Sequence, residues 1–253
     1  SPFHNLKVGD VVNVCGTFKI EPRKAKGRSD GYEFIIHVHN ITLVDDIFED
    51  SRISEEDVAE IIELSKQDNI FELLCNSIAP EVYGYETIKK GLILQLFEGN
   101  RPANDTFKTS QMDRWTIHTL LIGDPGIGKS QLIQSMKMRA PKNITISGTN
   151  TSQAGFTVST VKDELTGTWT MEAGATVLAD TGVLCIDEYD KLSPSAQKSL
   201  NEPMEQSTVS SAKAGLVQTM SARTSILAGA NPKYSKFDPY KSHREQLDIP
   251  DSN

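Results

Sequence analysis

One short segment constrains this chain more than any other: residues 123–130 read Gly-Asp-Pro-Gly-Ile-Gly-Lys-Ser. They fit the pattern G-x-x-x-x-G-K-[ST], which is typical of a loop that wraps the phosphates of a nucleotide. Its glycines allow backbone conformations that are closed to residues with a Cβ, so successive N–H groups can converge on phosphate oxygens. The segment therefore predicts a strand, a phosphate-binding loop and a helix in that order.

The residues on both sides of the loop support this interpretation. Residues 116–122 form a short apolar run that predicts a strand, and residues 130–138 read as a helix whose N-terminus faces the phosphates. Lys129 would place a positive charge at the β- and γ-phosphates, and the Ser130 hydroxyl would ligate Mg²⁺. The sequence thus predicts ATP and Mg²⁺ as cofactors. The residues expected around the phosphates are Asp124, Pro125, Gly126, Ile127, Gly128, Lys129, Ser130 and Gln131.

Two later strands are predicted to end in residues that act on the γ-phosphate. Residues 183–186 are an apolar run typical of a buried parallel strand, and Asp187 and Glu188 follow directly. At the carboxyl end of such a strand, Asp187 would hold Mg²⁺ and Glu188 would polarise the attacking water. Another predicted strand, 224–230, ends at Asn231, which could orient that water or contact the γ-phosphate. The predicted catalytic residues are Lys129, Asp187, Glu188 and Asn231.

Composition places the chain among ordinary globular proteins. Of its 253 residues, 38% are hydrophobic and 24% charged, and the net charge is −8. An acidic chain argues against a surface that coats nucleic acid, but it allows a local set of cations that contacts DNA. The sequence has no apolar run of membrane-spanning length and no signal-peptide pattern, so we expect an intracellular protein without a membrane partner. The isolated Cys15, Cys75 and Cys185 are expected to be buried thiols in a reducing environment.

The chain also divides into regions of different pattern. Residues 8–44 have β character, with strands expected at 8–16, 34–39 and 40–44. Three strands are too few for a free-standing sheet, which suggests the tail of a β-barrel. An acidic linker follows, and helices are expected to begin at Ser54 and to run over 70–78 and 85–97. From residue 116 onward strands and helices alternate, which predicts a parallel α/β sheet covered by helices.

Several further motifs, in their order, resemble the ATPase core of the minichromosome maintenance (MCM) family, the ring-forming AAA+ replicative helicases of archaea and eukaryotes. The resemblance covers roughly residues 54–247, and residues 6–44 more weakly resemble the last strands of the family's OB-fold. The segments that carry it are residues 78–84 (IAPEVYG), 169–175 (WTMEAGA), 178–180 (LAD), 185–192 (CIDEYDKL), 204–206 (MEQ), 212–215 (AKAG), 222–225 (ARTS) and 228–232 (AGANP).

The resemblance implies a fold and a domain organisation. The fold is an AAA+ P-loop parallel sheet flanked by helices, with β-hairpin inserts, preceded by the C-terminal strands of an all-β OB-fold. The domains implied are residues 1–45 as the OB-fold tail, 46–53 as a linker and 54–253 as an AAA+ core that is incomplete at its C-terminus. The family's arginine finger, helical lid and zinc-binding part have no counterpart in this sequence. Because a finger supplied in trans contributes a factor of about 10³ or more, we expect this chain alone to hydrolyse ATP poorly.

The resemblance also assigns roles to individual residues. Ile78 and Tyr83 lie in the segment that is beside the adenine in the family. Residues 155–174 and 208–223 would form two hairpins that point into the channel of the ring. Lys213, at the tip of the second hairpin, would contact a phosphate of DNA.

Two more residues receive roles in the same way. Gln206 lies at the base of the second hairpin and would couple it to the nucleotide. Arg114 matches the arginine of a family triplet used near a neighbouring subunit, although Trp115 and Thr116 replace its Gly-Asp.

The function implied is that of an MCM-type helicase subunit. It would hydrolyse ATP within a ring, draw single-stranded DNA and unwind duplexes during DNA replication. The partners implied are single-stranded and forked DNA, related subunits in a homo- or hetero-hexamer, and replication factors. The location would be the cytoplasm or nucleoid in an archaeon and the nucleus in a eukaryote. Two alternatives stay open: an AAA+ remodeller of proteins or cofactors, and a catalytically weak MCM-like regulator that binds nucleotide.

Overall fold

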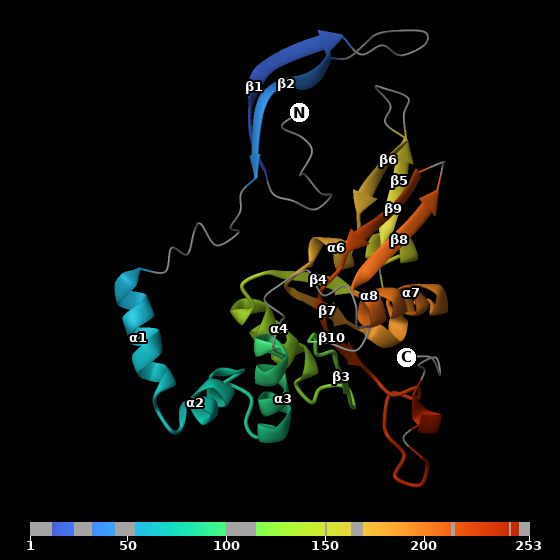
Figure 1. The fold of residues 1–253 in the computed structure, drawn as a ribbon. Coiled ribbons are helices and arrows are strands. Elements are labelled where there is room, and N and C mark those ends of the chain that lie inside the picture. Colours follow the sequence, from blue (N-terminus) through green and yellow to red (C-terminus); the bar gives the residue numbers. More distant parts are fainter. Residues whose placement is uncertain are drawn as a thin grey trace. The chain divides into compact units, whose positions relative to one another are not determined.

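The computed structural model describes residues 12–22, 32–43, 54–99, 115–149, 151–162, 169–213, 216–242 and 244–247 of the chain (Figure 1). Contacts divide the chain into two units, residues 1–52 with 160–172 and residues 53–159 with 173–253. The first unit contains β1, β2 and most of β5 and β6, and the second contains the remaining elements. No helix in the described residues is long and apolar enough to cross a membrane.

The N-terminal strands form one antiparallel hairpin of β1 (Val12–Pro22) and β2 (Tyr32–Leu43). The prediction of two strands at 34–39 and 40–44 was wrong, because the ladder continues through the polar residues around Asn40, which pairs with Cys15. The register shifts between Cys15 and Gly16. A Cβ added to Gly16 would collide with the His37 carbonyl. Cys15 is exposed, so its predicted burial was also wrong, whereas Cys75 and Cys185 are buried.

A four-stranded parallel sheet forms the centre of the second unit, in the strand order β3–β10–β7–β4. Because all four strands are parallel, their carboxyl ends lie at one edge, where Ser147 pairs with Asp187 and Ile122 with Ala230. The predicted α/β class is confirmed. The strands are β3 (Thr119–Ile122), β4 (Asn143–Ser147), β7 (Val183–Asp187) and β10 (Ser225–Ala230).

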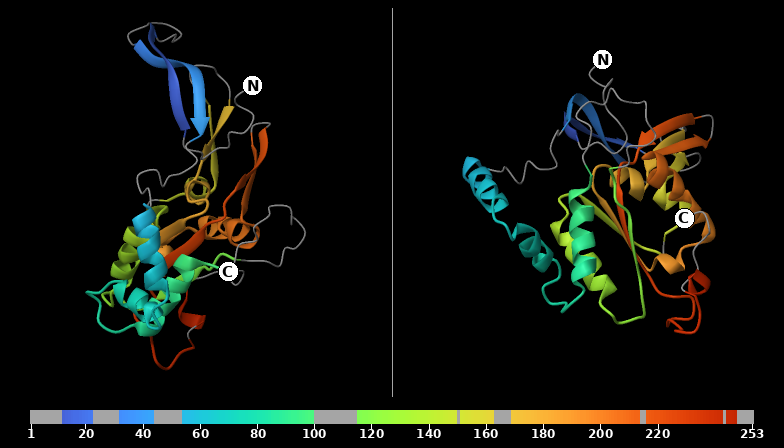
Figure 2. Two further views of the ribbon diagram at one scale, coloured as in Figure 1. Left: turned by 60° about the vertical axis from the view of Figure 1, so that its left-hand side comes forward. Right: turned by 60° about the horizontal axis from the view of Figure 1, so that its bottom comes forward.

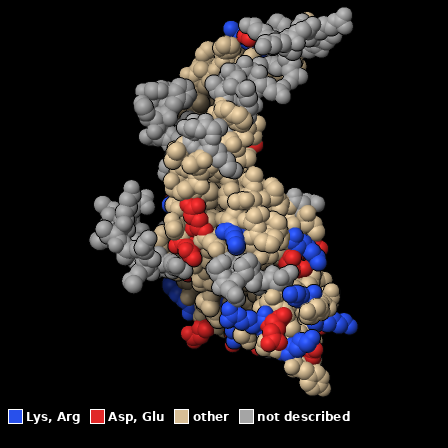
Figure 3. Space-filling model, turned by 90° about the vertical axis from the view of Figure 1, so that its right-hand side faces the viewer, with Lys and Arg blue, Asp and Glu red and all other residues tan. Residues whose placement is uncertain are grey.

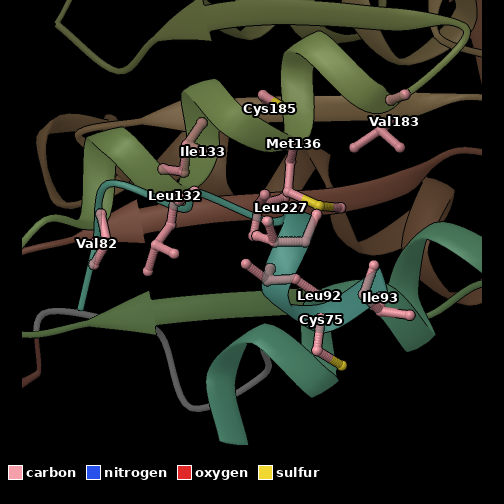
Figure 4. Packing of buried hydrophobic residues seen from close by; sticks show 13 residues of the cluster. Cys75, Val82, Leu92, Ile93, Leu132, Ile133, Met136, Val183, Cys185 and Leu227 are labelled. Carbon is pink, nitrogen blue, oxygen red and sulfur yellow. The ribbon is translucent and has the colours of Figure 1, made fainter. Parts of the chain in front are cut away.

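Helices cover both faces of this sheet, as Figure 2 shows. Successive residues of β7 alternate between two hydrophobic clusters: Val183 and Cys185 pack with α2–α4 (Figure 4), and Leu184 and Ile186 pack with residues of α5, α6 and α7. A strand that is buried on both faces must be apolar at every position, which explains the uninterrupted run at 183–186. The helices are α2 (Ile70–Ser77), α3 (Glu86–Phe97), α4 (Lys129–Arg139), α5 (Gln153–Phe156), α6 (Ala175–Leu178), α7 (Pro194–Ser199) and α8 (Asn201–Gln206).

The remaining elements also follow the predicted order. Helix α1 (Glu55–Ser65) begins after Ser54, whose hydroxyl accepts from the Asp57 N–H while the Asp57 carboxylate accepts from the Ser54 N–H. The two implied hairpins are present, each on its expected segment. They consist of β5 (Val158–Lys162) with β6 (Trp169–Ala173) and β8 (Thr208–Lys213) with β9 (Leu216–Ser221).

An ion pair joins the segments that lead into the two central strands. Asp180, before β7, accepts from the Arg223 N–H at 2.7 Å and, through its two oxygens, from Nε at 3.2 Å and Nη2 at 2.8 Å. Burial is the largest single influence on the pKa of Asp180 and raises it. The hydrogen bonds and the charge of Arg223 together outweigh burial and hold the pKa below its ordinary value. The pair therefore stabilises the fold while Asp180 is ionised.

This ion pair predicts how stability depends on acid. Because the folded-state pKa of Asp180 is depressed, its contribution is present above the unfolded value of about 4 and is lost as pH falls through the folded pKa. We expect Asp180→Asn to be less stable than the unsubstituted chain at pH 7 and to lose less stability between pH 5 and 3. Urea unfolding at several pH values measures both effects, and parallel pH profiles would contradict the assignment.

Candidate nucleotide site

The phosphate loop has the backbone that its glycines predict. It connects β3 to α4, and Gly126 and Gly128 have φ angles of 84° and 91°. No described atom lies within 4 Å of a Cβ built on Gly126, so the loop leaves an open cradle there. Because α4 begins at Lys129, its first N–H groups border this cradle, which is an arrangement that favours an anion.

Lys129 joins the loop to the end of β10. Its Nζ donates to the carbonyls of Gly123 at 2.7 Å and Asp124 at 2.8 Å, and to Asn231 Oδ1 at 3.0 Å. Burial lowers the pKa of Lys129, while the charges of Asp190, Asp124 and Asp187 act in the opposite direction. An ammonium group has three donors, and all three are used here. A phosphate that binds Lys129 must therefore replace at least one of these acceptors.

A cavity of about 410 Å³ lies at the carboxyl edge of the sheet. It brings together the four predicted catalytic residues, the predicted magnesium ligand Ser130 and much of the phosphate loop. Its volume lies within the range of sites for small molecules and cofactors. The lining residues are Pro125, Gly126, Gly128, Lys129, Ser130, Gln131, Asp187, Glu188, Gly229, Ala230 and Asn231.

Glu188 is held by hydroxyl groups at the end of β4. Its backbone is left-handed, with φ 56° and ψ 46°, and Glu188 Oε2 accepts from Ser147 Oγ at 3.2 Å and Thr149 Oγ1 at 3.4 Å. Gly148 permits this approach, because an added Cβ would overlap the Glu188 carbonyl. The contacts of these two hydroxyls were not predicted, and the only signal for them in the sequence is their position at the end of an apolar run.

Asp190 fixes the start of the segment after β10. Its Oδ1 accepts from the Asn231 backbone N–H at 2.9 Å. Asp190 therefore ties the short 3₁₀ helix Tyr189–Lys191, which follows Glu188, to the residue that also contacts Lys129. Asp190 was not predicted as a site residue, although it follows the Asp-Glu pair by only two positions.

Comparison with known proteins identifies the family. The MCM P-loop domain matches residues 57–252 of the chain. This chain belongs to the MCM family.

Individual MCM proteins align with nearly the whole chain. DNA replication licensing factor mcm4 of Schizosaccharomyces pombe is 37% identical over 97% of this chain and 30% of its own length. MCM3 of Oryza sativa subsp. japonica is 36% identical over 98% of the chain and 32% of its length, and MCM4 of Arabidopsis thaliana is 45% identical over 80% and 24%. The chain thus spans about a third or less of the length of these relatives. The resemblance stated from the sequence is confirmed.

The two residues that the resemblance places near adenine lie outside the cavity. The side chain of Ile78 is fully buried in the hydrophobic cluster of α2–α4, so only its backbone could face a ligand. The side chain of Tyr83 is 100% exposed. Their contact with a base stays a prediction for this MCM chain.

Asp124 and Ile127 of the MCM phosphate loop also lie off the cavity lining. Asp124 Oδ1 accepts from the Phe237 backbone N–H at 2.9 Å, and the Ile127 side chain lies against Gly123. The segment after Asn231 is held together by the buried Gln246, whose amide bonds to the backbone at Asp238, Lys241 and Ser242. Asp124 thus anchors this segment to the phosphate loop.

The residues predicted to act outside the nucleotide site have separate positions. Gln206 is exposed at the end of α8, next to Ser207, which is left-handed at φ 56° and begins the turn into β8. Lys213 is the last residue of β8, as expected for a hairpin tip, but its side chain lies outside the described part of the structure. Arg114 also lies outside the described residues.

The residues at the cavity fit a magnesium–nucleotide complex. Ser130 and Asp187 offer a hydroxyl and a carboxylate at the same cavity, and a Cβ at position 229 would approach Asp187 Oδ1 to 3.4 Å. Among the described residues, no cluster of three His, Cys, Asp or Glu could hold a metal by itself. A hydroxyl and a carboxylate suit Mg²⁺, which keeps several waters and is bound by one or two protein groups together with substrate phosphates.

The Asp124 contact predicts a local change in backbone protection. In Asp124→Ala the Phe237 N–H loses its acceptor, and we expect its hydrogen exchange to accelerate by about tenfold or more. The Lys233 N–H donates to the Gln246 carbonyl at 2.8 Å and should keep its protection. Asp124→Asn retains an acceptor and serves as the control. Residue-resolved hydrogen exchange measures these amides, and unchanged exchange of Phe237 in Asp124→Ala would contradict the anchoring role.

Proposed function

We propose that this chain binds and hydrolyses ATP as the motor part of an MCM-type DNA helicase subunit that acts in DNA replication. The observation that carries the proposal is the single cavity that contains Lys129, Ser130, Asp187, Glu188 and Asn231. These are the residue types that a phosphate-loop ATPase needs for charge neutralisation, metal binding, water activation and contact with the γ-phosphate. Membership of the MCM family supports the same function.

In this proposal, each residue has a task that its surroundings suit. Lys129 leaves at least one of its three acceptors to bind the β- and γ-phosphates, and Ser130 and Asp187 hold Mg²⁺, which would neutralise phosphate charge. Glu188 leaves the hydroxyls of Ser147 and Thr149 to orient the attacking water. When Lys129 binds phosphate in place of Asn231 Oδ1, the Asn231 side chain becomes able to contact the γ-phosphate.

The proposed work of the motor is movement of DNA through a ring of related subunits. Lys213 at the end of β8, in the second hairpin, would contact a backbone phosphate, and the first hairpin, β5–β6, would lie in the same channel. On the face shown in Figure 3, the described Lys and Arg side chains are interspersed with Asp and Glu. Binding of DNA would therefore depend on a few placed cations rather than on a general basic surface. The names of the relatives, DNA replication licensing factors, support a role in replication, and their eukaryotic sources favour the nucleus. The proposed partners are related subunits in a hexamer and replication factors, as the resemblance implies.

The ATPase function is tested by separating binding from turnover. We expect Lys129→Ala to weaken ATP binding, because the phosphates lose their ammonium contact. Glu188→Gln should still bind ATP but lose turnover by about 10²-fold or more, because the amide cannot polarise water. Calorimetry measures the binding and phosphate release measures the turnover, at increasing protein concentration to allow assembly. Lys90→Ala, which removes an exposed lysine of α3, is the control. Binding without turnover in the unsubstituted chain, even after a family C-terminal arginine segment is appended, would favour the regulator.

The DNA function needs a second measurement. We expect single-stranded DNA to stimulate the ATPase rate of the extended chain, and Lys213→Ala to remove most of this stimulation while leaving the basal rate unchanged. Lys198→Ala, which changes an exposed lysine of α7, should leave both rates unchanged. Hydrolysis without any response to DNA would favour the alternative of an AAA+ remodeller of proteins or cofactors.

A further inference from the structure

The loop of residues 78–84, between α2 and α3, is held by hydrogen bonds from the side chains of both neighbouring helices α3 and α4. Ala79 has φ 40°, a left-handed conformation that a residue with a Cβ adopts only where its surroundings hold it. Its N–H donates to Ser135 Oγ at 2.7 Å, and its carbonyl accepts from Lys89 Nζ at 3.0 Å. Lys89 Nζ donates to the Val82 carbonyl as well, at 2.8 Å. The loop is thereby held from α3 and from α4.

Lys89 is an uncommon anchor because it is buried, with 7% of its surface exposed. A buried ammonium is costly unless its donors are satisfied, and here the 78–84 loop supplies two carbonyl acceptors. The acceptors lie three residues apart, so Lys89 fixes the curvature of the loop between them. Its neighbour Lys90 is exposed. The two lysines thus have different roles within one helix turn.

Helix α4 holds the other side of the same loop. Arg139 Nη1 donates to Ser135 Oγ at 2.7 Å and to the Ser135 carbonyl at 3.2 Å, and Arg139 Nη2 donates to the Ser77 carbonyl. Ser135 is buried and receives the Ala79 N–H at the same time. Helix α4, which begins at the phosphate loop, therefore also holds the start of the 78–84 loop through the side chains of Ser135 and Arg139.

The 78–84 loop packs beside the phosphate loop, and its residues are not among those that line the cavity. A Cβ built on Gly128 would lie 3.7 Å from Val82 Cγ1 and 3.4 Å from Gln131 Oε1, so Val82 packs beside the last glycine of the phosphate loop. Asp187, Glu188 and Asn231 line the cavity together with Gly128. A nucleotide with its γ-phosphate at Asn231 would extend its nucleoside towards Val82. The exposed Tyr83 follows Val82 directly.

We propose that Lys89 is a positioning residue for the nucleoside end of the nucleotide. By holding the carbonyls of Ala79 and Val82 it keeps Val82 beside Gly128, with the exposed Tyr83 next in the chain, so that the two side chains would contact base and ribose. The proposal rests on the proposed nucleotide function of the cavity. It predicts that Lys89 contributes to the affinity for ATP but not to that for the phosphates alone, which contact the loop from Gly123 to Ser130.

The test compares ATP with inorganic tripolyphosphate, which has the phosphates without the nucleoside. We expect Lys89→Met, which keeps the length of the side chain but removes its donors, to weaken ATP binding by about tenfold and to change tripolyphosphate binding by less than about twofold. Lys90→Met is the matched control and should change neither. Titration calorimetry in the presence of Mg²⁺ measures the affinities of both ligands for the unsubstituted chain and for each of the two variants.

The outcomes separate this proposal from the proposed function. Equal weakening of both ligands, or unchanged ATP affinity in Lys89→Met, would overturn the positioning role. If Lys89→Met does not fold, Ser135→Ala removes the acceptor of the Ala79 N–H and carries the same expectation. An unsubstituted chain that binds ATP no more tightly than tripolyphosphate would overturn the positioning role alone. A chain that binds neither ligand would overturn the proposed function and this inference with it.

Discussion

The ammonium group of Lys129 is the point on which the functional edge of the sheet depends. It bonds to two carbonyls of its own loop and to Asn231 at the end of β10, so it connects the carboxyl ends of the neighbouring strands β3 and β10. The charges of Asp190, Asp124 and Asp187 favour the ionised form against the effect of burial. Because every donor is in use, the site is organised before a phosphate arrives. Binding is then an exchange of acceptors within a formed site rather than the assembly of a new one.

The loops around this ammonium are connected to one another by single, well-defined bonds. Asp190 holds the Asn231 N–H, the Asp187 carbonyl accepts from the Gly148 N–H at 2.8 Å, and Asp124 holds the Phe237 N–H. Each bond joins segments that follow different strands. If Lys129 moves away from Asn231 or Asp124, the residues after β10 would therefore move as well. They would move together, because Gln246 bonds to several of them. This is a physical route by which the presence of a phosphate could be reported to a part of the chain that does not line the cavity.

The sequence predicted the parts of this site that depend on strand ends. Lys129, Asp187, Glu188 and Asn231 come together because parallel strands share one carboxyl edge, and that follows from the apolar runs and the phosphate-loop pattern alone. Other contacts could not be predicted, because they depend on local backbone conformations that no sequence pattern indicates. These are the contacts of Ser147, Thr149, Asp190 and Lys89. Glu188 and Ala79 are left-handed although neither is glycine, and these conformations decide where a carboxylate and two carbonyls point. The continuous β2 was missed for a related reason, since pairing with β1 kept polar residues in a strand.

Helix α4 links the two ends of the proposed nucleotide site. Its first turn borders the phosphate cradle, and further along it Ser135 and the last residue, Arg139, hold the loop that carries Val82 and Tyr83. Phosphates and nucleoside would thus be bound by two loops that share one rigid support, with α3 adding Lys89 from the other side. Since the covalent bonds of the nucleotide limit the distance between the phosphates and the base, a common support keeps the two loops at a spacing that the ligand can span. Separate supports would allow the two contacts to drift apart, and the cost of restoring their spacing would reduce affinity.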